Sequence, residues 1–173
     1  MNLYTDVQRY EKLQHEDFDA IVTGELTHYA IWLEDGLAKI IADFFAKPSR
    51  KKQFIGLIVR GESLPFKIEI IRAIIPDFKN QTAAQQLSPL LKRIEAVSTR
   101  RNAFAHGFDV TPKSAKAASI HVELIRRAGK NKPFEVTPAS HVATMNEMEQ
   151  LLEAVTSIRK KLNVKPRTRS SGG

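Results

Sequence analysis

The sequence predicts a mainly α-helical protein with one β-hairpin just before its last helix. Most apolar residues recur every three or four positions, which is the period of a helix with one buried face. One short segment near residue 120 instead alternates between apolar and polar residues, which is the period of a β-strand. The chain has 173 residues, of which 42% are hydrophobic, so it is long enough to bury a core.

The first long helix is predicted over residues 17–46, after a polar lead-in (1–15) that contains a short helical piece. Pro48 ends this helix. Gly24 and Gly36 each weaken it by about 1 kcal/mol relative to alanine. Its apolar positions are Phe18, Ile21, Val22, Leu26, Tyr29, Leu33, Leu37, Ile40, Ile41, Phe44 and Phe45.

Two shorter apolar segments follow. Ser49 is expected to cap a helix with an apolar face. Residues 66–75 carry isoleucines at helical spacing, although their β-branched content leaves a strand open as an alternative. Residues 77–83 are expected to be a polar loop. The apolar face of the segment after Ser49 consists of Phe54, Leu57 and Ile58.

A second long helix is predicted over about residues 84–106. Gly107 follows it directly, at a position where helices commonly end on glycine. Its apolar stripe consists of Leu87, Leu90, Leu91, Ile94, Val97 and Ala105.

The predicted hairpin pairs a strand over residues 120–125 with a return strand over 134–136. Thr137 is suited to cap the final helix, and Pro138 fits its first position. The apolar face of this helix consists of Val142, Met145, Met148, Leu152, Val155, Ile158 and Leu162.

Composition excludes several classes of protein. The chain has no cysteine, so it contains neither disulfides nor cysteine metal sites. No apolar run approaches the ~20 residues that span a membrane, and the polar N-terminus does not resemble a signal peptide. The five histidines match no metal-binding spacing, and no glycine-rich nucleotide motif occurs. We expect a cytoplasmic protein without a membrane partner, metal or cofactor, forming one domain over residues 1–163 with a disordered basic tail over 164–173.

Charge is distributed unevenly along the chain. Residues 1–46 hold 3 basic and 9 acidic residues, a net charge of −6. Residues 47–173 hold 24 basic and 10 acidic residues, a net charge of +14. This asymmetry has two interpretations: a polyanion partner such as RNA, or an acidic first helix that packs on a basic body.

One stretch, Arg101-Asn102-Ala103-Phe104-Ala105-His106, combines residue types that carry chemistry. Arg101 points within about 20° of the centre of the apolar stripe, where an unpaired charge is costly. Its guanidinium therefore needs an anion, which is either an internal carboxylate or a bound phosphate. The candidate internal partners are Glu25, Glu34 and Asp35.

The functional interpretation of this stretch is RNA cleavage without a metal. An arginine fork holds a phosphate with two hydrogen bonds, and a histidine one turn after Asn102 moves protons to and from oxygen atoms. Basic clusters elsewhere are predicted to attract the RNA backbone. The predicted RNA-binding residues are Arg100, Arg126, Arg127 and Lys130, whereas Phe104, Phe108 and Phe134 are expected in the core.

The Arg101-Asn102-x-x-x-His106 spacing, with the Ala-His-Gly ending of its helix, resembles the R-x4-6-H signature of the HEPN superfamily. The resemblance extends to the long first helix, the position of the signature at a helix end and the closing helix. It implies a helical bundle, a homodimer with a composite active site, and metal-independent endoribonuclease activity. Arg101 and His106 would be catalytic, and Asn102 would support them.

The resemblance also suggests biological roles. Many HEPN proteins are toxins of toxin–antitoxin systems or act in antiviral defence, so an antitoxin or defence protein is an expected partner. Some are controlled by modification of a tyrosine two residues after the histidine, where this chain has Phe108. Other members are non-catalytic modules that bind a protein or RNA, and this remains the alternative function.

Overall fold

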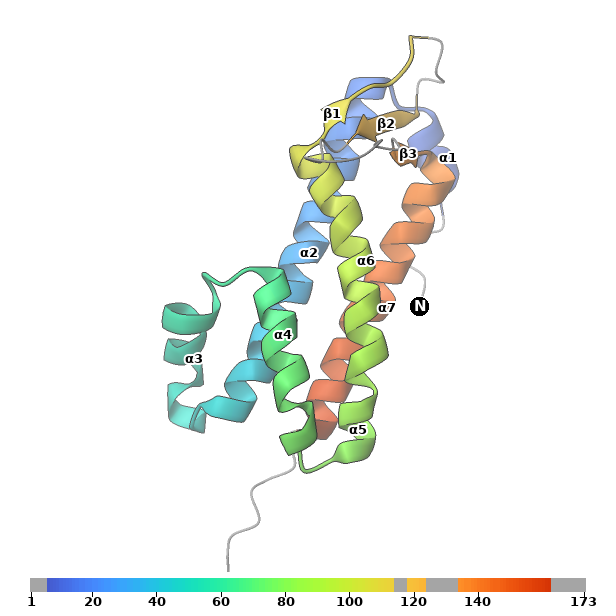
Figure 1. Cartoon of the computed structure of the whole chain (residues 1–173). Coiled ribbons are helices and arrows are strands. Elements are labelled where there is room, and N and C mark those ends of the chain that lie inside the picture. The colour runs from blue at the N-terminus through green and yellow to red at the C-terminus, as the bar shows by residue number, and fades with distance from the viewer. Residues whose placement is uncertain (1–5, 114–117, 124–133, 163–173) are drawn as a thin grey trace, which may run out of the picture. The chain divides into compact units, whose positions relative to one another are not determined.

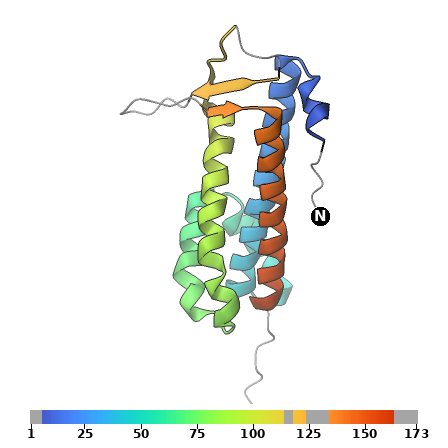
Figure 2. The same ribbon diagram turned by 90° about the vertical axis from the view of Figure 1, so that its right-hand side faces the viewer.

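The computed structural model describes residues 6–113, 118–123 and 134–162, and this part of the chain is mainly helical (Figures 1 and 2). The predicted fold class is confirmed. The helices are α1 (Val7–Glu11), α2 (His15–Phe45), α3 (Lys51–Phe54), α4 (Leu64–Ile74), α5 (Gln81–Gln85), α6 (Leu87–His106) and α7 (Pro138–Leu162). Shorter helical turns are η1 (Pro48–Arg50), η2 (Ile55–Val59) and η3 (Ile75–Asp77), and the strands are β1 (Phe108–Asp109), β2 (Ile120–Glu123) and β3 (Phe134–Val136).

The chain divides into two compact units. Among the described residues, unit 1 comprises those within 6–34 and 92–153, and unit 2 comprises those within 35–91 and 154–162. The long helices α2, α6 and α7 each contribute residues to both units. The predicted basic tail, 164–173, lies outside the described residues.

Unit 1 contains a three-stranded antiparallel sheet in the order β1-β2-β3. The predicted hairpin is present, with Ile120 opposite Val136. In β2, the buried Ile120 and Val122 alternate with half-buried neighbours, which matches the period-two pattern. Strand β1 was not predicted, because two residues are too few to show a period. Figures 1 and 2 show the sheet where α6 ends and α7 begins.

A buried polar network ties three helices of unit 1 together. The His141 ring is 1% exposed and packs edge-on against the rings of Tyr10 and Phe18. Glu25 accepts hydrogen bonds from His141 Nε2 at 2.6 Å and from the Tyr10 hydroxyl at 3.2 Å. These contacts satisfy a carboxylate that would otherwise be costly to bury.

Unit 2 corrects the prediction for the segment after Ser49. Ser49 makes no cap; it lies inside η1, whose N-terminus has no side-chain hydrogen bond. Leu57 and Ile58 are 85% and 57% exposed, so they do not form the predicted buried face. The cause is η2, a π-helical turn in which Arg60 N donates to Ile55 O at 2.8 Å. Its wider turn breaks the 3.6-residue spacing on which the prediction depended.

The next segment of unit 2 is helical, as its isoleucine spacing predicts. Ser63 Oγ accepts from Phe66 N and caps α4, which buries Ile68, Ile71 and Ile74. The predicted polar loop over 77–83 is shorter than expected. Asn80 Oδ1 accepts from Ala83 N at 3.1 Å and starts α5 within that range.

Candidate functional site

The candidate site lies at the C-terminal end of α6, in unit 1. Ile94 and Val97 are buried on the inner face of this helix, and Arg101 takes the next position on that face. Ala103 is also fully buried, whereas Ala105 is exposed. The apolar stripe therefore ends two residues earlier than predicted, on Ala103 instead of Ala105.

Arg101 is half-buried and its hydrogen bonds are incomplete. Its Nη1 donates to Asn102 Oδ1 at 2.9 Å. Its Nε is buried and has no hydrogen-bond partner among the residues that the structure describes. An unpaired buried donor costs about 1–3 kcal/mol. An anion that accepted a hydrogen bond from the guanidinium would remove this cost.

The internal ion pair considered for Arg101 is not formed. Glu25 binds Tyr10 and His141 instead, and Asp35 pairs with Lys39 on its own helix. Within the described ranges, Arg101 has no ion pair at all. A structural salt bridge therefore does not explain why this position is an arginine.

Asn102 and His106 lie on the same side of α6. They are separated by about 40° around the helix and about 6 Å along its axis, and both are exposed. Arg101 starts about 140° from His106, but its hydrogen bond to Asn102 turns the guanidinium toward their side. The His106 ring makes no hydrogen bond or ion pair with the residues that the structure describes.

Gly107 allows the chain to turn sharply after the site. Its N–H donates to Ala103 O at 2.7 Å. A Cβ at this position would lie 2.3 Å from both Ala103 O and Val122 Cγ1. Its φ lies outside the left-handed region, so glycine is needed here for close packing against β2 and α6.

A histidine clamp holds the strand that follows the site. His15 Nε2 donates to Asp109 Oδ2 at 2.9 Å, and His15 Nδ1 donates to Ser119 O at 3.0 Å. The bond to Asp109 raises the pKa of His15, despite partial burial, because both ring nitrogens donate. Hydrogen bonds from Thr111 and then His15 lower the pKa of Asp109. No local pattern in the sequence indicates this contact, because it joins residues 94 positions apart.

Phe108 is not in the core, contrary to expectation. It is 59% exposed on β1, two residues after His106, and Val110 nearby is 41% exposed. Phe104 and Phe134 are half-buried. Phe108 is exposed because it lies on the short outer strand of the sheet, where nothing described covers it.

The predicted RNA-binding residues are only partly described. Arg100 is exposed, and its Nη1 donates to Thr144 Oγ1 on α7 at 2.9 Å. This bond ties α6 to α7, and the other guanidinium nitrogens of Arg100 have no partner among the described residues. Arg126, Arg127 and Lys130 lie outside the described residues.

Comparisons of the chain with protein-family models, with curated proteins and with solved structures give no match. In the described part of the chain, no helix is both long and apolar enough to cross a membrane. Among the same residues, no group of three or more histidine, cysteine, aspartate or glutamate side chains is arranged to hold a metal ion.

Proposed function

We propose that the protein is a metal-independent endoribonuclease that cleaves single-stranded RNA. The proposal rests on one observation above all: Arg101 lies on the buried face of α6 with an unpaired Nε and no ion pair among the described residues. A phosphate would supply the missing acceptor. Asn102 and His106 stand next to this anion site with exposed side chains.

The reaction uses a nucleophile that the substrate carries. His106, in its neutral form, takes the proton of a ribose 2′-OH, and the 2′ oxygen attacks the adjacent phosphorus. A bond forms between the 2′ oxygen and phosphorus, and the bond from phosphorus to the 5′ oxygen breaks. A proton passes to the leaving 5′ oxygen, so the products are a 2′,3′-cyclic phosphate and a 5′-OH. DNA lacks the 2′-OH and is not a substrate.

Arg101 supplies charge at the phosphate. Its planar fork donates to two nonbridging oxygens and stabilises the negative charge that grows on them in the transition state. Asn102 already accepts from Arg101 Nη1, so it orients the fork before substrate arrives. The Asn102 amide also reaches the side of α6 that carries His106.

The proposed active form is a homodimer with a composite site. On one helix, Arg101 and His106 leave the axis about 140° apart, and a second copy of the motif would bring a second arginine and histidine to the same phosphate. Phe108 and Val110 are exposed beside the motif and supply apolar area for such a contact. RNA is the proposed substrate, and a role as a toxin or defence nuclease with a protein antitoxin belongs to the same proposal.

The test is cleavage of one labelled RNA by the purified protein in EDTA, beside the same sequence made as DNA. We expect cleavage of the RNA alone, with a cyclic phosphate on the 5′ fragment. Equal cutting of the DNA contradicts the mechanism. If the wild type cuts none of a varied set of RNAs, the alternative of a non-catalytic module that binds RNA or a protein replaces this proposal.

A further inference from the structure

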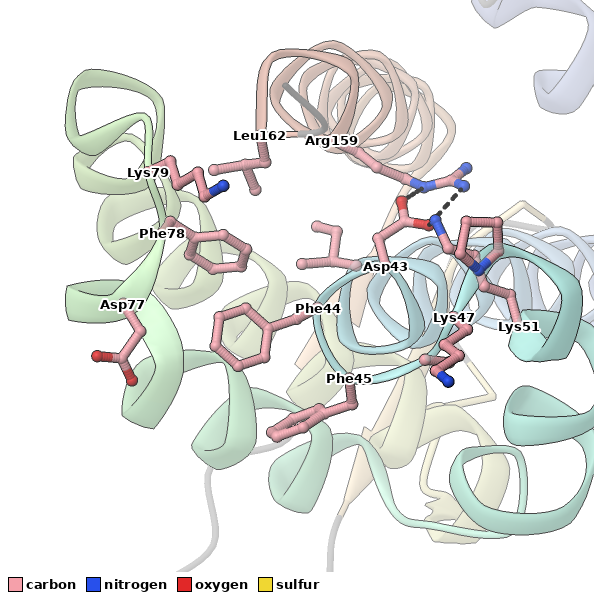
Figure 3. Close-up of a pocket in the computed structure, with 13 residues that line it drawn as sticks. Asp43, Phe44, Phe45, Lys47, Lys51, Asp77, Phe78, Lys79, Arg159 and Leu162 are labelled. Atoms are coloured by element: carbon pink, nitrogen blue, oxygen red, sulfur yellow. Dashed lines mark hydrogen bonds and ion pairs between the residues drawn. The ribbon is translucent and has the colours of Figure 1, made fainter. Parts of the chain in front are cut away.

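Unit 2 contains a pocket that the proposed nuclease reaction does not use. Its volume is about 600 Å³, within the range that holds a drug-sized molecule. The end of α2, η1, α3, η3 and the end of α7 form its walls (Figure 3). The large apolar residues of its lining are Ile40, Phe44, Phe45, Phe78 and Leu162.

Aromatic rings dominate the apolar side of this pocket. The Phe44 ring meets those of Phe78 and Phe45 edge-on, with centroids 5.2 Å and 4.8 Å away. Figure 3 shows the Phe44 and Phe78 rings next to the open space, with Leu162 across from them. Edge-on pairs are the geometry that aromatic groups prefer, so a further aromatic ring is a suitable occupant.

The charged wall of the pocket is built around Asp43. Its side chain is 8% exposed and accepts from Lys51 Nζ and Arg159 Nε, each at 2.6 Å. Burial alone would raise the pKa of Asp43, but the hydrogen bonds from Arg159 and Lys51 outweigh burial and hold the pKa below its usual value. This carboxylate is therefore neutralised by two cations and does not repel an anion.

The opposite wall is fixed by side chains that bind the turn before α5. Gln81 Nε2 donates to Pro76 O at 2.9 Å and to Phe78 O at 2.5 Å. Asn80 Nδ2 donates to Lys161 O at 3.4 Å, which ties the turn to the end of α7. Phe78 is thereby held in place, and the pocket is largely formed without a ligand.

Positive charge is in excess in the pocket. Its lining includes four cations but only two carboxylates, Asp43 and Asp77. Lys79 is exposed and has no partner among the described residues. Figure 3 shows its ammonium group extending between Phe78 and Leu162, toward the open space, while Asp77 points elsewhere. The other lining cations are Lys47, Lys51 and Arg159.

We infer that this pocket binds a small aromatic anion, with the aromatic body against Phe44, Phe78 and Leu162 and the negative group on Lys79. The apolar lining supplies most of the affinity, and the lysine supplies the preference for charge. This pocket does not include the residues at the end of α6, so ligand binding here can be tested separately from RNA cleavage.

The experiment compares two fluorescent probes that share one aromatic skeleton and differ by a single sulfonate group: the anion 1-anilinonaphthalene-8-sulfonate and the uncharged N-phenyl-1-naphthylamine. We expect each to bind the full-length protein saturably, with one molecule per chain. Lys79→Glu should weaken binding of the sulfonate about tenfold and change binding of the neutral probe less than about twofold. Lys52→Glu is the matched control, because Lys52 is exposed on α3 but does not line the pocket.

A second variant tests the location without relying on charge. Leu162→Trp should fill part of the space and weaken both probes, with circular dichroism confirming that the variant is folded. Leu57→Ser, which alters exposed apolar surface outside this pocket, should leave both unchanged. The inference is overturned if Leu57→Ser removes binding while Leu162→Trp does not, or if Lys79→Glu and Lys52→Glu have the same effect.

Discussion

At the scale of single residues, Arg101 is the position whose surroundings are hardest to explain by structure alone. Its place on the inner face of α6 would suit an apolar side chain, and replacing it by one would remove an unpaired buried donor. No described carboxylate compensates for this cost. A residue with an unpaired buried donor that lies beside an exposed asparagine and histidine is typical of a functional site.

His106→Ala should lower RNA cleavage by roughly 10²–10⁴-fold, the usual size of a general acid–base contribution. Arg101→Lys should restore only part of the activity lost in Arg101→Ala, because an ammonium lacks the planar fork. RNA binding should persist in each variant, since the many basic residues supply most of the attraction. Initial cleavage rates and filter binding measure the two effects. Full activity in folded His106→Ala contradicts the assignment.

The His15 clamp predicts a pH-dependent stability. The folded pKa of His15 is raised above the ordinary value of 6.5, so the clamp contributes fully below that pH. Its contribution is lost as pH rises through the folded pKa. The contact is partly exposed, so its contribution to stability is small. Between about pH 5.5 and pH 8.5, the wild type should lose about 0.5–1 kcal/mol more stability than His15→Gln.

Urea denaturation at the two pH values measures the clamp. His28→Gln is the control, because His28 is exposed on the same helix and makes no ion pair with the described residues. If His15→Gln shows the same pH dependence of stability as the wild type, protonation of His15 is not linked to folding.

At the scale of elements, periodicity predicts the long helices well and the short pieces poorly. Residues 17–46 and 84–106 were predicted as helices, and α2 and α6 occupy nearly those ranges. Many buried residues at one period outweigh local exceptions such as mid-helix glycines. The α3–η2 segment has few turns, so one π-helical turn is enough to expose Leu57 and Ile58.

The site was partly predictable for the same reason. Arg101, Asn102 and His106 lie on one helix, so their relative directions follow from helix geometry alone. The lack of an ion pair for Arg101 among the described residues and the exposure of Phe108 depend on what other elements bring nearby, which periodicity does not place. The His15–Asp109 clamp joins α2 to β1, and neither residue carries a local signal for the other.

Two glycines of α2 give a matched test of helix packing. Gly24 has open space around the position of a Cβ, so Gly24→Ala should stabilise the protein by about 0.5–1 kcal/mol. At Gly36 a Cβ would lie 2.8 Å from Val155 Cγ1, and Gly36→Ala should destabilise it by about 1 kcal/mol. Thermal unfolding of both variants measures the difference. Equal shifts would show that this contact with α7 does not limit residue 36.

At the scale of the whole molecule, charge separates the first 46 residues from the rest. The net charge of these 46 residues is −6, and some of their carboxylates bind basic groups of the same chain. Glu25 binds His141, and Asp43 binds Lys51 and Arg159. The excess of +14 in residues 47–173 is far larger than these contacts neutralise. A large unneutralised positive charge favours a polyanion partner and makes its binding sensitive to salt.

We expect sedimentation at micromolar concentration to show a homodimer whose contact includes the end of α6, with Phe108 at the interface. Phe108→Asp should shift the protein toward monomer, because it places a charge in an apolar contact. Phe66→Asp is the control, since Phe66 is a similarly exposed phenylalanine on α4.

A composite site predicts more than dimer formation, because residues of both chains must act on the same phosphate. If one phosphate is held by Arg101 from one chain and meets His106 from the other, two inactive variants should complement each other. Arg101→Ala and His106→Ala homodimers, unfolded together and refolded as a mixture, should recover cleavage that neither has alone. Mixing either variant with Phe108→Asp should recover none, because that chain does not pair. A dimer without complementation would place each active site within a single chain, and a monomer with full activity would contradict the composite site altogether.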